Sequence, residues 1–204
     1  MAPVDPEFVA AAHALDADGW CWIPQFLESA PTDALATECA ALHDANLLLP
    51  AGTGATRTVS TARGDRTRWF NADALSGPQR TFADRIDALR VAFNRHLMLG
   101  LVDSESHYAV YRPGAVYARH LDRLRNDDSR VVSCVFYLNR DWHEADGGAL
   151  RLHLPGGSFQ DIYPHAGGLV AFLSGSFEHE VRPATRDRMS IACWMRQRPI
   201  DARR

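Results

Sequence analysis

The sequence contains no lysine, and all 22 of its basic side chains are arginine. A Schiff-base enzyme needs a lysine amine, and a P-loop needs a lysine against the phosphates, so the sequence excludes both chemistries. A GxSxG motif is also absent, which argues against a serine hydrolase of the nucleophile-elbow type. The arginine bias is typical of a GC-rich genome, so we expect a bacterial source.

Cysteine is sparse, and its four positions are scattered. No two cysteines form a CxxC pair, so the ligand spacing of a structural zinc ribbon is missing. Each cysteine stands among apolar residues, which is typical of reduced cysteines that pack as small hydrophobic side chains. The four residues are Cys21, Cys39, Cys134 and Cys193.

Long apolar runs and a strong net charge are missing too. No run approaches the roughly 20 apolar residues of a membrane-spanning helix, and the N-terminal "MAPVDPEF" lacks the pattern of a secretory signal. The net charge of −3 provides no broad basic field for nucleic acid. We therefore expect a cytoplasmic monomer with no membrane or nucleic-acid partner. A length of 204 residues suits one domain rather than two.

The first hundred residues are predicted to be mainly helical. Apolar residues recur at helical spacing in "DPEFVAAAHALDADGW", "SAPTDALATECAALHDAN" and "SGPQRTFADRIDALRVAFNRHLMLG". Gly19 and Gly100 mark the ends of the first and third of these helices. Between the helices, "GWCWIPQFL" predicts a short strand. Residues 50–68 are rich in Gly, Thr and Arg and predict a loop or an irregular hairpin.

From residue 106 onward the period changes to that of β-strands. Short segments rich in β-branched and aromatic residues are separated by turn signals such as "DGG" and "PGG". This pattern predicts a mainly β fold with flanking helices (α+β), in which the strands form a double-sheet jelly roll. The segments are "HYAVYR", "RVVSCVFYL", "GALRLHL", "SFQDIYP", "GGLVAFL", "HEVRPA" and "RMSIACWM".

A histidine and an aspartate stand two positions apart in "YARHLDRLRND": His120 and Asp122. On extended backbone both side chains project to the same face. His179 opens the strand "HEVRPA" in the same β region. Two imidazoles and one carboxylate are the ligands of the facial triad in non-haem iron oxygenases, which leaves coordination positions open. Zinc hydrolases can use the same set with a further base, but the HExxH motif is absent.

Arg188 lies nine residues after His179. Two strands joined by a turn would bring both residues to the same open end of the predicted barrel. A buried guanidinium is costly unless it meets an anion, and its planar fork fits a carboxylate. Tyr137 and Tyr111 could turn their phenols towards the same carboxylate. The alternative is that Arg188 lies on the surface and that both tyrosines are core residues.

At these residues the sequence resembles the 2-oxoglutarate- and iron(II)-dependent dioxygenases, in particular the prolyl 4-hydroxylases of the oxygen-sensing type and their bacterial relatives. The matching pieces are "HLD", "RVVSCVFYLNRDW", "DGGALRL", "HEVRPATRDR" and "IACW". Upstream, "GWCWIPQFL", "ALHDAN" and "ARGDRTRWF" resemble the N-terminal strand, helix and substrate-covering finger loop of the family. The resemblance covers nearly the whole chain. It implies one domain over residues 1–204, with helical support and the finger loop in 1–100 and a double-stranded β-helix (jelly roll, cupin-like) in 101–198.

The resemblance also implies a role for each matching residue. The implied iron ligands are His120, Asp122 and His179. The implied 2-oxoglutarate ligands are Arg188, which would pair with the distal carboxylate, and Tyr137 and Tyr111, which would donate hydrogen bonds. The implied contacts to a peptide substrate are Arg130, Trp194, Arg63 and Asp65.

The activity implied is 4-hydroxylation of a proline with Fe(II), 2-oxoglutarate and O2, with ascorbate as a candidate reductant. A finger loop that carries Arg57, Arg63, Arg66 and Arg68 suits an extended protein segment, and the similar bacterial enzymes suggest elongation factor Tu as the substrate. Two alternatives stay open. One is a hydroxylase of a free amino acid or small metabolite on the same fold. The other is a non-catalytic metal-binding cupin-like barrel, which would leave Arg188 without a purpose.

Overall fold

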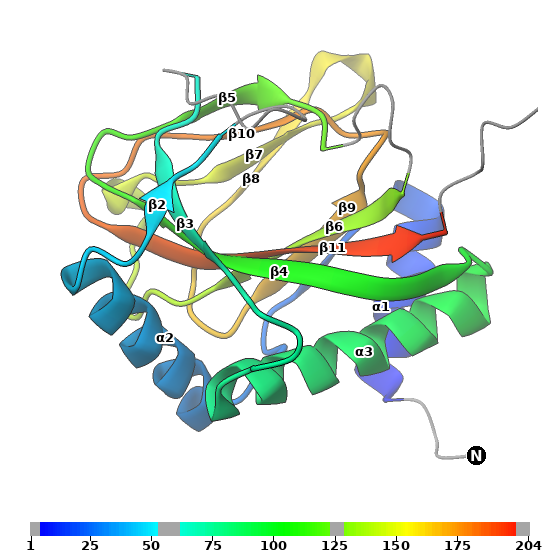
Figure 1. Cartoon of the computed structure of the whole chain (residues 1–204). Helices are drawn as coiled ribbons and strands as arrows, with labels where there is room; N and C mark the ends of the chain where they lie inside the picture. Colours follow the sequence, from blue (N-terminus) through cyan, green and yellow to red (C-terminus); the bar gives the residue numbers. More distant parts are fainter. Residues whose placement is uncertain (1–4, 53–61, 123–128, 199–204) are drawn as a thin grey trace, which may run out of the picture.

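The computed structural model describes residues 5–52, 62–122 and 129–198. This part of the chain holds three α-helices, all within the first hundred residues, and eleven strands, of which eight follow the last helix (Figure 1). The helices are α1 (Pro6–Asp18), α2 (Ser29–Asp44) and α3 (Gly77–Leu97). The strands are β1 (Trp20–Ile23), β2 (Leu49–Pro50), β3 (Asp65–Trp69), β4 (Leu101–Tyr111), β5 (Tyr117–His120), β6 (Arg130–Tyr137), β7 (Leu150–His153), β8 (Phe159–Ile162), β9 (Leu169–Leu173), β10 (His179–Val181) and β11 (Arg188–Gln197).

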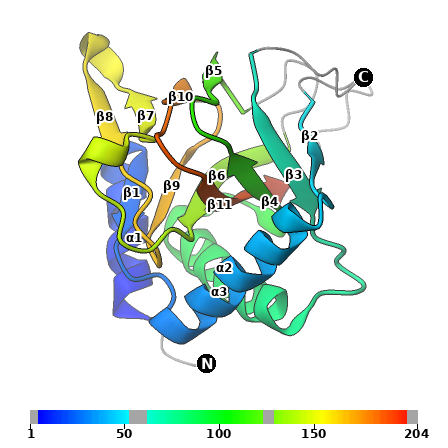
Figure 2. The ribbon, with the colours of Figure 1, turned by 90° about the vertical axis from the view of Figure 1, so that its left-hand side faces the viewer.

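The strands form two sheets that face each other. The seven-stranded sheet has the order β1-β9-β6-β11-β4-β3-β2, and the four-stranded sheet has the order β5-β10-β7-β8. All the strand pairings in both sheets are antiparallel. Strands β4, β11, β6 and β9 lie opposite β5, β10, β7 and β8, which confirms the predicted double-stranded β-helix. Figure 2 shows α2 and α3 beneath the seven-stranded sheet, with the four-stranded sheet on its other side.

The seven-stranded sheet separates two hydrophobic cores. Along β11, Ile191 and Cys193 pack against the helices, whereas the alternate residues Ser190 and Ala192 line a pocket between the sheets. This alternation follows from the two-residue period of a strand. The helix-side core is apolar, so the polar groups of the strands are concentrated in the interior of the barrel. The helices therefore support the sheet that forms one wall of the site.

The three predicted helices are confirmed, with one difference at an end. Asp5 and Ser76 cap the N-termini of α1 and α3 by accepting hydrogen bonds from backbone N–H groups. Gly19 takes the left-handed conformation that ends α1, as predicted. Helix α3, however, ends at Leu97, because Met98 adopts the left-handed conformation (φ 52°) that caps it; Gly100, which is also left-handed (φ 67°), lies beyond the cap. None of the described helices is long and apolar enough to span a membrane.

Two further predictions need correction at the level of strands. β4 begins at Leu101, well before the predicted segment "HYAVYR". The four residues of β5 form a strand that the sequence pattern did not single out. At the ends of the segment 50–68, β2 and β3 pair as an antiparallel hairpin, whereas residues 53–61, with Arg57, lie outside the described part of the chain. All four cysteines are buried and free, as predicted.

Phe82 is a test of the helix-side core. Its ring is fully buried and lies 5.5 Å from the ring of Phe136 and 6.2 Å from that of Phe26, so it joins α3 to β6 and to the segment after β1. We expect Phe82→Ala to lower the free energy of unfolding by about 3–5 kcal/mol, because it leaves a cavity. Urea unfolding monitored by circular dichroism would measure this. The control Phe159→Ala, at a ring that is 53% exposed, should change stability far less; equal losses would contradict the assignment.

Candidate metal centre and cosubstrate pocket

The two histidines of the proposed metal site are direct neighbours across two strands. β5 and β10 pair antiparallel with His120 opposite His179, and the two ring centroids lie 4.2 Å apart. Each imidazole donates from Nδ1 to a backbone carbonyl two residues earlier, Ala118 at 2.7 Å and Phe177 at 3.2 Å. Such a bond fixes the ring and leaves Nε2 as the free lone pair for a metal.

Asp122 completes the group. Its Oδ1 lies 3.5 Å from Nε2 of His120, and its Oδ2 lies 3.5 Å from Nε2 of His179. The ligand atoms of the three residues all lie within 4.8 Å of one another, which is a spacing that a single ion can bridge. Among the described residues, this is the only group of three or more His, Cys, Asp or Glu with that property. The structure therefore brings together the three ligands predicted from sequence.

The protonation states of the site favour a divalent cation. Burial alone would raise the pKa of the Asp122 carboxyl, but His179, His120 and Ser133 outweigh it and hold that pKa well below its usual range. Burial lowers the pKa of His179 to about 4, so its imidazole is neutral at pH 7. One carboxylate and neutral imidazoles are the forms that coordinate a metal.

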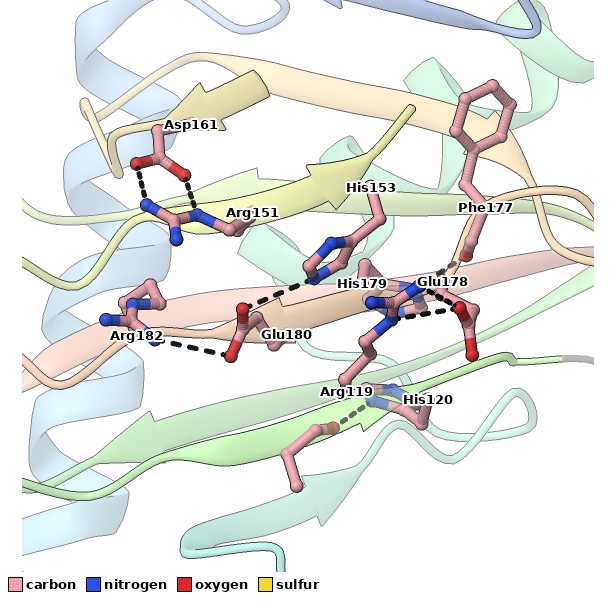
Figure 3. A network of polar contacts seen from close by, with 11 residues as sticks. Arg119, His120, Arg151, His153, Asp161, Phe177, Glu178, His179, Glu180 and Arg182 are labelled. Atoms are coloured by element: carbon pink, nitrogen blue, oxygen red, sulfur yellow. Dashed lines mark hydrogen bonds and ion pairs between the residues drawn. The ribbon is translucent and has the colours of Figure 1, made fainter. Parts of the chain in front are cut away.

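Polar contacts between side chains join neighbouring strands of the four-stranded sheet (Figure 3). Arg151 on β7 pairs with Asp161 on β8, and His153 on β7 contacts Glu180 on β10. Arg119 on β5 pairs with Glu178, next to β10. Each such pair contributes little to stability on its own, because solvent screens it. Only the Arg119–Glu178 pair joins β5 to the residue before β10, next to the two facing histidines.

The three ligands line a pocket between the sheets, and Arg188 lies in the wall of the same pocket. The Arg188 side chain is 1% exposed; its Nε donates to the carbonyl of Gly148 at 2.8 Å, and its Nη1 donates to Ser190 Oγ at 3.2 Å. Its Nη2 has no hydrogen-bond partner in the described structure. A buried cation without a carboxylate is unstable unless a ligand supplies one.

The phenol of Tyr137 is a second unpaired donor beside this arginine. Its ring lies 5.3 Å from the Arg188 guanidinium, and its hydroxyl is buried without a partner in the described structure. Burial raises the pKa of Tyr137 to about 12, so the hydroxyl keeps its proton at pH 7. Tyr111 lies directly opposite Arg188 in the β4–β11 register and lines the same pocket. The guanidinium and the phenols therefore suit an anionic ligand such as the distal carboxylate of 2-oxoglutarate.

Arg63 and Asp65, which were predicted to contact a peptide, pair with each other. Two hydrogen bonds of 2.7 and 3.0 Å join the guanidinium to the buried carboxylate. The same guanidinium stacks 4.6 Å from the ring of Tyr117, which in turn stacks on His120 with centroids 3.5 Å apart. Both residues line the pocket. Asp65 is thus placed to orient Arg63. Arg63 in turn supports the ring of Tyr117, which covers the candidate metal ligand His120.

Of the other two predicted substrate contacts, Trp194 lines the pocket and Arg130 lies against its ring outside the lining. The Arg130 guanidinium lies 3.9 Å from the Trp194 ring and pairs with Glu105. Trp194 lines the pocket, and its indole Nε1 is buried with no hydrogen-bond partner among the residues that the structure describes. Trp69 stacks on Trp194 at 5.9 Å, and His107 contacts both tryptophans. This part of the wall is aromatic and rigid.

Sequence reasoning missed several residues that the structure places around the site. His107, Trp69 and Tyr117 were not singled out, although they line or border the pocket. Ser133 was missed as well, and its hydroxyl donates to Asp122 Oδ2 at 2.7 Å. A usable signal existed for Ser133, a polar residue within the apolar run of β6, but not for His107, which directly follows the polar residues 103–106 of β4. Their side chains could not be assigned to the barrel interior without the strand register.

The fold and the site together define a class of protein, a non-haem iron oxygenase that takes a dicarboxylate cosubstrate. Comparison with known families agrees: the profile of the 2OG-Fe(II) oxygenase superfamily matches residues 106–196. Human prolyl hydroxylase EGLN3 is 30% identical over 86% of this chain and 77% of its own length. The chain belongs to the 2OG-Fe(II) oxygenase superfamily, whose members use Fe(II), 2-oxoglutarate and O2.

Within that superfamily, the similar proteins of known structure include prolyl hydroxylases. A prolyl-4-hydroxylase from Pseudomonas putida is 42% identical, with a TM-score of 0.86 over 94% of this chain and 99% of its own. A Trichoplax adhaerens prolyl hydroxylase in complex with a peptide of hypoxia-inducible factor is 26% identical, with a TM-score of 0.83 over 92% and 87%. Human Egl nine homolog 1 is 29% identical over 86% of this chain, which spans 43% of that relative's length. The chain thus covers only about half the length of its Egl nine homolog 1 relatives.

Removing one metal ligand tests the triad. We expect His179→Ala to abolish measurable Mn(II) or Fe(II) binding, because only one imidazole and one carboxylate remain. Isothermal titration calorimetry with Mn(II) would measure the loss, and succinate release would report turnover. The control His153→Ala alters a histidine on the neighbouring strand that contacts Glu180 and should leave binding intact. Normal succinate production by His179→Ala would refute the assignment of the ligand.

Arg188→Met tests the carboxylate partner. The substitution keeps an unbranched side chain but removes the guanidinium, so we expect the KM for 2-oxoglutarate to rise on the order of 100-fold with a smaller effect on kcat. Steady-state assays at varied 2-oxoglutarate would measure the two constants. Arg182→Met, at an exposed arginine that pairs with Glu180, is the matched control and should not change the KM. A KM that is equally unaffected in both variants would contradict the role of Arg188.

Proposed function

We propose that this protein is an iron(II)- and 2-oxoglutarate-dependent dioxygenase that hydroxylates C4 of a proline in a protein substrate. One observation carries the proposal. The triad of His120, Asp122 and His179 shares a pocket with the buried Arg188, and Tyr137 lies beside that arginine. Arg188 Nη2 and the Tyr137 hydroxyl are both buried without a hydrogen-bond partner in the described structure. A metal-binding barrel without catalysis would have no use for a buried, unpaired guanidinium beside the triad.

The reaction consumes one O2 and one 2-oxoglutarate and yields succinate, carbon dioxide and hydroxyproline. Bound Fe(II) supplies the activation of O2 and its coupling to decarboxylation. His120, Asp122 and His179 would hold the ion by three positions and leave the remaining ones open. Arg188 and Tyr137 would bind the distal carboxylate and so orient the cosubstrate. The surrounding apolar residues of the barrel exclude water from the pocket.

The second half of the proposal is a polypeptide substrate. Beside the metal pocket lies a groove lined by residues of β2, β3 and β4, and the two share Arg63 and His107 in their walls. The groove also carries Trp69, which suits a substrate with apolar contact surface. The similarity to prolyl hydroxylases supports proline as the residue modified. An open groove that continues the pocket suits an extended segment better than a free amino acid.

We further propose a proline of elongation factor Tu as the target, on the resemblance to bacterial prolyl 4-hydroxylases. The experiment is to incubate the purified protein with this factor, Fe(II) and 2-oxoglutarate and to map modified peptides by mass spectrometry. We expect one added oxygen atom on a single prolyl residue. Two controls are the His179→Ala variant and a reaction without 2-oxoglutarate, and neither should show the product.

The same experiment separates the competing substrates. If elongation factor Tu stays unmodified while the protein still consumes 2-oxoglutarate, the factor is not the substrate, and a panel of proteins and free amino acids should be assayed for stimulated succinate release. Stimulation by free proline or another small metabolite alone would overturn the protein-substrate proposal. Failure to consume 2-oxoglutarate under any condition would overturn the enzymatic proposal itself.

A further inference from the structure

Two serines connect the metal ligand Asp122 to the seven-stranded sheet. The Ser133 hydroxyl on β6 lies 2.7 Å from Asp122 Oδ2 and 2.9 Å from the hydroxyl of Ser174, which follows β9. The two serines are 1% and 0% exposed, respectively. Their hydroxyls are therefore withdrawn from water and have to satisfy each other and the carboxylate.

The direction of these hydrogen bonds follows from the number of protons. Ionised Asp122 can only accept, so Ser133 must donate its single hydroxyl proton to Oδ2. Ser133 then has no proton left for Ser174, and Ser174 must donate to Ser133. The chain Ser174 to Ser133 to Asp122 is fixed in one direction, and each bond polarises the next.

Asp122 needs such an anchor because of its place in the fold. β5 ends at His120, so Asp122 lies beyond the strand and is not held by its ladder. The two histidines, by contrast, are held within paired strands. Ser133 and Ser174 belong to the opposite sheet, where a backbone bond from Ser174 to Val131 ties the second serine to β6. The two hydroxyl groups of Ser174 and Ser133 thus reach across the barrel. They hold Asp122, the one residue of the triad that lies outside a strand.

We propose that Ser133, supported by Ser174, is a positioning residue for the metal centre and that it keeps Asp122 a one-oxygen ligand. A lone pair of Oδ2 is committed to the Ser133 hydroxyl, so the carboxylate does not turn both oxygens towards the ion. Coordination positions then stay open for the cosubstrate and O2, as an oxygenase of this kind requires. This inference rests on the proposed function, because it presumes that the triad binds a divalent metal.

The first test is the affinity for Mn(II), which needs neither substrate nor turnover. We expect Ser133→Ala to raise the Kd for Mn(II) about tenfold, within the range known for residues that orient metal ligands. Ser174→Ala should raise it less, because Ser133 can still donate. Ser133→Thr retains the hydroxyl and should restore the wild-type Kd. The matched control is Ser106→Ala, since Ser106 contacts Cys193 on the helix side of the sheet and should leave the Kd unchanged.

The second test reports coordination directly. The visible spectrum of the Co(II)-substituted protein depends on the number of ligands, so Ser133→Ala should change it and Ser133→Thr should not. Thermal unfolding in EDTA checks that the metal-free variants fold. If Ser133→Ala does not fold, the same measurements are made on Ser174→Ala.

An unchanged Kd and spectrum in Ser133→Ala would overturn the inference and leave the proposed function standing. A weaker Kd that Ser133→Thr does not restore would also overturn it, since repacking would then explain the change. A wild-type protein that fails to bind Mn(II) would overturn the proposed function as well.

Discussion

The pairing of β5 with β10 is the constraint on which the site depends. Because side chains alternate along a strand, a shift of one residue in this pairing would turn one histidine out of the barrel. In the observed register His120 stands opposite His179, and both imidazoles direct Nε2 towards Asp122. Two short strands, of four and three residues, thus hold the two histidines of the candidate metal site in place. The ion pair between Arg119, beside His120, and Glu178, beside His179, joins the two segments in this register.

A second constraint is electrostatic. The barrel interior holds the carboxylate of Asp122 and the guanidinium of Arg188. In the described structure these two groups do not form an ion pair with each other. Each charge is instead free to bind a ligand of the opposite sign: Asp122 a metal cation, and Arg188 an anion. Such a pocket is less stable than an apolar one until it is filled. The helix-side core, which is apolar and well packed, offsets that cost.

Much of the site was predictable from the sequence because the residue types themselves carry the chemistry. The pattern of His120, Asp122 and His179 is a ligand set, and Arg188 in a strand needs an anion, whichever protein contains it. For other residues of the site, the role could not be predicted from the sequence. Arg63 and Asp65 were expected to face a substrate, and only the structure shows that they pair and that Arg63 stacks on Tyr117. Ser133 and His107 are ordinary polar residues until the register turns them into the barrel.

The sequence by itself determined the fold class, the helices and most strands, and it singled out the candidate metal ligands and the arginine. It could do so because strand and helix periods are local and because metals and carboxylates demand particular side chains. Only the tertiary structure decided which faces of the strands meet. It set His120 against His179 and joined Ser174 and Ser133 to Asp122 across the barrel. Within the described part of the chain, it also left donors on Arg188, Tyr137 and Trp194 without partners. These contacts join residues distant in sequence, so their geometry follows from packing rather than from any local pattern.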